Sequence, residues 1–193
     1  MHPSVLLIFG TSHVGKSTLA AGMGTALGWK VLSTDQLARH PGRPWPEVKP
    51  AVADFYESLS DESIYWFLQV HHENLWPRIQ HLIAAESASR RGLVFEGSAL
   101  RPEFIASLEG QALVPIGLHA SADFLQRRIK TESRYNELDH RMRSLVDKFI
   151  TRSLHDNQNI VSAAQKLGLS LVNIEDRDKL GQLPNDLKEL LSR

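Results

Sequence analysis

The chain has 193 residues, enough for one compact domain with a sizeable core, and 42% of them are hydrophobic, which excludes a disordered chain. Its 22 Lys and Arg balance its 22 Asp and Glu, so bulk charge gives no support to a role on nucleic acids or membrane surfaces. The absence of cysteine excludes disulfides, thiolate zinc sites and cysteine nucleophiles.

The first predicted element is a strand over residues 4–9, SVLLIF, whose unbroken apolar run is typical of a strand buried on both faces of a parallel sheet. This run is too short for a membrane span or a signal peptide core and lacks a basic leader, so we expect a cytoplasmic protein. The sequence GTSHVGKS follows directly and fits the pattern G-x-x-x-x-G-K-[ST]. Residues 17–28 are rich in Ala and Leu, which predicts a helix that ends at Gly28.

A strand, a glycine-rich loop and a helix in this order form a phosphate-binding site, because the loop amides and the helix N-terminus both attract anions. Lys16 is expected to reach the β- and γ-phosphates, Ser17 to ligate Mg²⁺, and Thr18 to help at the α-phosphate. His13 occupies a variable position and is expected to face solvent. The predicted nucleotide-binding residues are Gly10, Thr11, Ser12, His13, Val14, Gly15, Lys16, Ser17 and Thr18.

The remaining pattern alternates strands with helices. Strands are predicted over residues 29–34, 92–96, 112–120 and 169–174, with Pro115 indicating an irregularity or a sheet edge. Helices are predicted after Pro50, over 61–90 with a kink or split at Pro77, over 101–108, from Ser121 to 130, over 142–168, and over 183–193 with Asn185 or Asp186 as cap. Such alternation predicts a parallel sheet with helices on both faces.

The chain resembles the P-loop small-molecule kinases, the group of shikimate, gluconate and nucleoside monophosphate kinases. The resemblance is carried by GTSHVGKST after the first strand, STD after the second, FEG after the third, FLQRRI after the fourth, and an arginine-bearing insert beyond it. It implies one domain over 1–193, a three-layer α/β/α sandwich with a five-stranded parallel sheet in the order 2-3-1-4-5, an acceptor-binding helical insert at about 36–90, and a lid at about 128–142.

The implied activity is transfer of the γ-phosphoryl group of ATP, with Mg²⁺, to a small-molecule acceptor. We expect no membrane or nucleic-acid partner, and either a monomer or a homodimer. Asp35 follows the second strand, where it would take the acceptor proton or hold its hydroxyl, or else cap the following turn. Glu96 ends the third strand and would lie near the metal or contact the acceptor, while Gly97 and Ser98 would let a substrate approach closely.

Arginines complete the predicted site, because a guanidinium binds phosphate through two hydrogen bonds and keeps its charge. Arg128 and Arg134 are the predicted catalytic arginines, with Arg127 as the alternative to Arg128. Acceptor binding is assigned to Arg39, Arg43, Trp45 and Arg101, although Trp45 could instead pack its loop onto the body. The adjacent His71 and His72 are expected to be structural or superficial, not metal ligands.

Two other functions remain open on the sequence. One is a nucleotide or polynucleotide 5′-kinase, or a kinase of an antibiotic or sugar nucleotide. The other is a switch or assembly factor that binds and slowly hydrolyses ATP without transferring phosphate. Substitution of Asp35 distinguishes a kinase from a switch. A kinase should lose phosphoryl transfer while keeping its nucleotide affinity, whereas a switch should be nearly unaffected.

Overall fold

The computed structural model describes residues 3–108 and 112–192. Five parallel strands form one sheet in the order β2-β3-β1-β4-β5, which confirms the predicted fold class and strand order. The strands are β1 (Val5–Phe9), β2 (Lys30–Ser33), β3 (Leu93–Gly97), β4 (Leu113–His119) and β5 (Leu171–Asn173).

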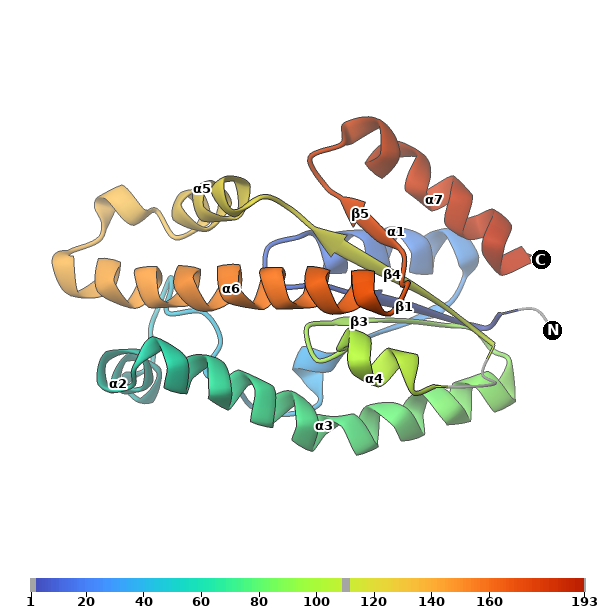
Figure 1. The fold of residues 1–193 in the computed structure, drawn as a ribbon, viewed down its shortest axis with the longest axis horizontal. Helices are drawn as coiled ribbons and strands as arrows, with labels where there is room; N and C mark the ends of the chain where they lie inside the picture. The colour runs from blue at the N-terminus through green and yellow to red at the C-terminus, as the bar shows by residue number, and fades with distance from the viewer. Residues whose placement is uncertain (1–2, 109–111, 193) are drawn as a thin grey trace.

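Helices cover both faces of the sheet (Figure 1). The helices α1 (Lys16–Leu27) and α7 (Arg177–Ser192) pack on one face, and α3 (Asp61–Ser89), α4 (Pro102–Ala106) and the second half of α6 (His140–Lys166) pack on the other. The helices α2 (Pro50–Ser58) and α5 (Ala122–Glu132) lie with the first half of α6 at one end of the molecule, beyond the strand tips. Short 3₁₀ turns η1 (Thr34–Gln36) and η2 (Tyr135–Glu137) complete the chain.

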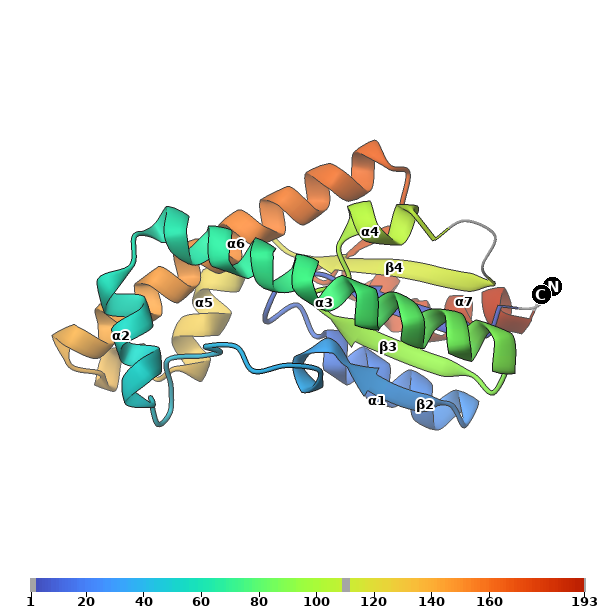
Figure 2. The same ribbon diagram turned by 90° about the horizontal axis from the view of Figure 1, so that it is seen from below.

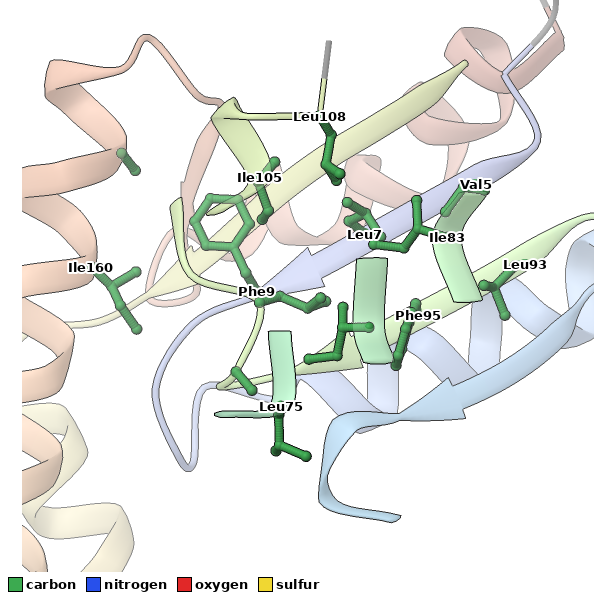
Figure 3. Close-up of a cluster of buried hydrophobic side chains, with 14 residues drawn as sticks. Val5, Leu7, Phe9, Leu75, Ile83, Leu93, Phe95, Ile105, Leu108 and Ile160 are labelled. Atoms are coloured by element: carbon green, nitrogen blue, oxygen red, sulfur yellow. The ribbon is translucent and has the colours of Figure 1, made fainter. Parts of the chain in front are cut away.

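The central strand β1 fixes the position of the loop that follows it. All five of its side chains are fully buried, because helices press on both faces of the sheet. Val5, Leu7 and Phe9 point to the face shown in Figure 3, where they meet Ile79 and Ile83 of α3. Leu6 and Ile8 point to the opposite face, toward α1 and α7. The unbroken apolar run in the sequence is the signature of this double burial.

A third hydrophobic cluster joins the predicted insert to the predicted lid segment. Trp45, Ala53, Tyr56 and Ile64 of the insert are buried against Ile129 of α5 and against four residues of α6: Leu145, Val146, Phe149 and Ile150. Figure 2 shows α2, the start of α3, α5 and the start of α6 gathered at the same end. The long helix α6 therefore belongs to both the sheet and this outlying cluster.

Two element predictions differ from the structure in detail. A kink or split was expected at Pro77, and the split is wrong, because α3 is one continuous helix whose buried residues before and after the proline, Leu75 and Ile79, hold one face on the sheet; a kink there stays a prediction. The last helix begins at Arg177 rather than near Asn185, because Asp176 accepts a hydrogen bond from the Lys179 amide and caps the helix earlier. The final residue of that prediction, 193, lies outside the described residues.

Pro115 lies inside β4 at a position where its missing amide proton costs no hydrogen bond. The amide of Gly117 donates to Ser170 on the β5 side, and Pro115, two residues earlier, faces the same side. The pairing with β5 covers only Gly117 to His119, so Pro115 lies before β5 begins. On its other side β4 pairs with β1 along this stretch. Pro115 therefore lies at a local edge of the sheet, on the β5 side only.

Candidate functional site

The loop between β1 and α1 takes the shape that the glycine pattern predicts. Gly10, His13 and Gly15 have positive φ angles of 140°, 67° and 88°. A Cβ atom on Gly10 would overlap the carbonyl oxygen of Leu118, so the first glycine is required where the loop leaves the sheet. The Thr11 hydroxyl donates to the Ser153 carbonyl of α6 at 3.2 Å, which ties the loop to that helix.

Lys16 folds back over this loop. Its Nζ donates to the Thr11 carbonyl at 2.6 Å, and the side chain is buried. Burial lowers the pKa of Lys16, while the nearby carboxylates of Glu96, Asp35 and Asp156 act in the opposite direction. A cationic group held at the mouth of the loop by its backbone is suited to meet an anion there.

Ser17 and Glu96 lie together, as the predicted metal pair requires. The Ser17 hydroxyl donates to Glu96 Oε1 at 3.2 Å, and Glu96 is only 5% exposed at the end of β3. Hydroxyl and carboxylate oxygens are ligands that Mg²⁺ accepts, and it commonly takes few protein ligands beside substrate phosphates. Among the described residues no cluster of three or more His, Asp or Glu is arranged to hold a metal. The donor set fits a Mg²⁺ ion that phosphate oxygens share.

A cavity of about 190 Å³, here called the loop cavity, opens over the loop and is lined by Lys16, Ser17, Asp35, Glu96 and Arg128 among others. A second cavity of about 70 Å³, the inner cavity, lies between the loop and α3 and α6. The two share four lining residues, which are Ser12, Asp35, Arg43 and Ser98. The shared lining places the two cavities side by side, with Asp35 between them.

A third, largely apolar cavity of about 750 Å³ adjoins the loop cavity on the other side and is here called the apolar cavity. Gly15, Thr18 and Arg128 line both. Its wall is completed by apolar side chains such as Met23 of α1, Phe124 of α5, Ile174 just after β5, and Leu180 of α7. The apolar cavity, the loop cavity and the inner cavity therefore adjoin one another in this order, with the loop cavity in the middle.

His13 does not face solvent, and that expectation was wrong. Its ring packs against Trp45 and Phe149 at centroid distances of 5.8 and 5.7 Å, and the residue is 8% exposed. Burial, reinforced by Arg43, Arg128 and other cations, lowers the pKa of His13 to about 3, so the ring is neutral. Its Nε2 lies 3.2 Å from Glu132 Oε2, but the geometry is not that of a hydrogen bond.

Other residues assigned to the acceptor have structural partners. Arg101 forms a buried ion pair with Asp156. Trp45 is buried against Phe149 at a centroid distance of 4.9 Å, so it packs its loop onto the body. At Gly97, the space for a side chain is filled by Thr34, since an added Cβ would lie 2.7 Å from Thr34 Cβ. These three residues therefore have structural roles next to the site.

The predicted arginines are not all brought to the cavities. Arg43 and Arg128 line the loop cavity. Arg39 is exposed and lines none of the cavities described here. The guanidinium of Arg134 lies 4.0 Å from Glu137 on the surface, at the start of η2, and also lines none of them. In this conformation the lid therefore contributes Arg128, from α5, rather than Arg134.

Sequence reasoning expected a structural or surface role for His72 and did not select Arg152 or Asp156, yet all three line the inner cavity. Arg152 of α6 lies within 3.5 Å of the Ser12 hydroxyl and 4.3 Å from the Phe149 ring centre. His72 is 2% exposed, and its Nε2 lies 3.4 Å from the Ser98 hydroxyl. Asp156 completes the set. The only signals in the sequence were polar residues on the apolar faces of two long helices, and many surface positions of those helices carry the same residue types.

No family model and no curated protein matches the chain. Solved structures do. They include a shikimate kinase from Bacteroides thetaiotaomicron (16% identity, TM-score 0.51, 98% of each chain covered). They also include a tRNA isopentenylpyrophosphate transferase from Staphylococcus epidermidis (11% identity, TM-score 0.61, 98% of this chain and 99% of that one). A deoxyadenosine kinase from M. mycoides with bound dATP has 14% identity and a TM-score of 0.53, covering 96% of this chain and 99% of that one.

At these identities the likeness shows the fold alone, and the chain has the α/β fold of the P-loop kinases. In the part of the chain that the structure describes, no helix combines the length and the apolar character needed to cross a bilayer.

Proposed function

We propose that this protein, whose fold is that of the P-loop kinases, transfers the γ-phosphoryl group of ATP to a small polar acceptor. The nucleoside would occupy the apolar cavity, the triphosphate the loop cavity, and the acceptor the inner cavity. The observation that carries the proposal is the position of Asp35, which lines both the loop cavity and the inner cavity. A carboxylate at that boundary stands where an acceptor hydroxyl would meet a terminal phosphate.

Phosphoryl transfer depends on positioning and charge stabilisation more than on covalent help from the protein. The loop amides and Lys16 would hold the β- and γ-phosphates, and Arg128 would neutralise charge on the transferring group. The acceptor oxygen forms a bond to the γ-phosphorus while the bond between that phosphorus and the bridging oxygen of ADP breaks. Asp35 accepts the proton that the acceptor hydroxyl loses.

Ser17 and Glu96 are the residues that would hold Mg²⁺, directly or through its water ligands. A bound magnesium ion supplies positive charge that neutralises the phosphate oxygens. Because Glu96 is buried and already accepts a hydrogen bond from Ser17, its carboxylate is oriented before any ligand arrives.

The inner cavity favours a small polar acceptor over a polynucleotide. It is small, at about 70 Å³, and its polar lining includes Asp35, Arg43, His72 and Arg152. The segment 36–90 would serve as the acceptor-binding insert and 128–142 as the lid, since the first supplies Arg43 and the second supplies Arg128 to the loop cavity.

Substitution Asp35→Ala tests the proposal. We expect it to lower the rate of phosphoryl transfer about 10²–10⁴-fold, as loss of a positioned base does, with ATP affinity nearly unchanged. Transfer is measured from γ-labelled ATP to a panel of sugars, sugar acids, nucleosides and small hydroxylated metabolites, and affinity by calorimetry with Mg²⁺. Asp54→Ala is the control, because Asp54 is an exposed carboxylate of α2 that lines none of the cavities described here.

Two outcomes contradict the proposal. One is tight ATP binding by the wild type without transfer to any acceptor in the panel. The other is transfer that survives Asp35→Ala at the rate of the Asp54→Ala control. Slow ATP hydrolysis that is indifferent to Asp35 would instead support a nucleotide-dependent switch.

A further inference from the structure

One ion pair joins the insert to the lid directly above the phosphate loop. Arg43, in the loop before α2, donates through Nη1 to Oε1 of Glu132, the last residue of α5. Both side chains line the loop cavity together with Lys16 and Arg128. The contact therefore connects two segments that are 89 residues apart in the chain, at the place where a terminal phosphate is expected.

Glu132 has no role in the transfer proposed above. The cavity contains three carboxylates, and Asp35 and Glu96 are accounted for by the acceptor proton and the metal. Glu132 faces Arg43 and lies near Lys16 and Arg128 in the same cavity lining, which is a cationic environment suited to phosphate oxygens. The neighbouring His13 is neutral, since burial holds its pKa near 3, so it does not supply the countercharge.

We propose that Glu132 is a displaceable stand-in for the terminal phosphate: its carboxylate holds Arg43 over the loop cavity, and the γ-phosphate of a bound nucleoside triphosphate takes Arg43 from it. Carboxylates and phosphates accept hydrogen bonds from the same N–H groups of a guanidinium, so the two anions compete for one site. Arg43 then becomes a ligand of the transferring phosphoryl group, in addition to any contact that it makes with the acceptor.

The exposure of the pair makes this exchange feasible. The side chain of Arg43 is 52% exposed and that of Glu132 is 39% exposed, and ion pairs open to water to this extent are weak. A triphosphate carries more negative charge than one carboxylate, so it can displace Glu132 and also repels it. The carboxylate would move toward solvent, on the C-terminal end of α5.

The exchange makes a specific distinction between nucleotides, and it rests on the proposed nucleotide site. ATP brings the phosphate that must compete with Glu132, whereas ADP ends one phosphate short. Neutralising Glu132 should therefore favour ATP over ADP, and the gain should require Arg43. A carboxylate with a merely structural role would not produce a difference between the two nucleotides.

The test is calorimetric titration of the full chain with MgATP and with MgADP. We expect Glu132→Gln to tighten ATP binding about twofold to fivefold, as expected for removal of one weak, water-exposed ion pair that competes with the phosphate, and to leave ADP binding nearly unchanged. Arg43→Ala should weaken ATP more than ADP. In the double variant, the effect of Glu132→Gln on ATP should disappear.

Glu57→Gln is the matched control. Glu57 of α2 pairs with Arg141 of α6, so it is also a partly exposed carboxylate in an arginine pair between the insert and the lid. It lines none of the described cavities, and we expect its substitution to leave both nucleotide affinities unchanged. Thermal unfolding of each variant checks that the fold is intact.

Equal effects of Glu132→Gln on ATP and ADP, or a gain for ATP that persists in the Arg43→Ala background, would overturn this inference while leaving the proposed kinase intact. If the wild type binds neither nucleotide, the proposed function and this inference fail together. The comparison of ATP with ADP thus separates the two failures.

Discussion

Gly97 shows how a single residue sets the spacing between β3 and the turn that carries Asp35. Its φ is 152°, and an added Cβ would lie 2.7 Å from both Cβ and Cγ2 of Thr34. Thr34 is buried and precedes Asp35 in η1. The sequence motif predicted that Gly97 permits close approach, but the group that approaches is this turn of the same chain. The motif thus indicates that another group approaches Gly97 closely, but it does not indicate which group.

Gly97→Ala should destabilise the protein by about 1–3 kcal/mol, because Thr34 must move to admit the methyl group and the backbone conformation disfavours a side chain. Gly22→Ala is the control, since a Cβ there meets nothing within 4 Å and the position lies inside α1. We expect that control to raise stability by about 0.5–1 kcal/mol. Urea unfolding measures both, and equal effects would contradict the argument.

The motif residues of the glycine-rich loop could be picked out from the sequence one by one, although His13 was placed wrongly, whereas the residues that α6 adds to the inner cavity could not. Lys16 and Ser17 follow from a motif whose backbone geometry is fixed by its glycines. Arg152 and Asp156 lie on a long helix with many charged residues, and only the crossing of α6 over the loop distinguishes them from exposed ones. That crossing is a property of tertiary packing, which a single sequence does not specify.

At the scale of elements, α6 links the parts that a kinase of this fold would need to coordinate. It packs against the sheet through Ile160 and against the insert through Phe149, and it receives the Thr11 hydroxyl from the loop. The strands were predicted correctly, because apolar runs and the alternation of elements indicate them, and their order, which the resemblance to the P-loop kinases implied, was also correct. The packing of the insert against the lid was not predicted, because the sequence pattern of neither segment indicates which other segment it contacts.

Phe149→Leu should lower the free energy of unfolding by about 1–2 kcal/mol, because Phe149 is fully buried among Trp45, Tyr56 and His13 and leucine leaves part of that space unfilled. Phe67→Leu is the control at a position that is 37% exposed on α3, and it should cost less than about 0.5 kcal/mol. Chemical denaturation of both variants tests the difference. Comparable losses of unfolding free energy in the two variants would contradict the larger contribution expected of the buried Phe149.

At the scale of the whole molecule, stability should depend on pH through two histidines that are buried without charge. Burial lowers the pKa of His13 and of His72 to about 3 each. The unfolded chain binds a proton at each histidine near pH 6.5, so between these values the unfolded state holds more protons than the folded state. Stability is therefore complete above about pH 6.5 and falls as the pH decreases below it.

Well below pH 6.5, each of these histidines should contribute a slope of about 1.4 kcal/mol per pH unit. In His72→Gln the free energy of unfolding should fall less steeply between about pH 6 and pH 5, by the contribution of one histidine. Urea unfolding at a series of pH values gives the slope for the wild type and the variant. Parallel pH profiles would show that His72 is protonated in the folded state.

The contact between Trp45 and His13 has a practical consequence. The indole ring sits against a residue of the glycine-rich loop itself, whereas Trp66 is 65% exposed and Trp76 stacks on Phe104 of α4. With the other three tryptophans replaced by phenylalanine, the emission of Trp45 would become an intrinsic optical reporter of the loop. Arrival of a ligand at the loop could then be followed in real time without any attached dye.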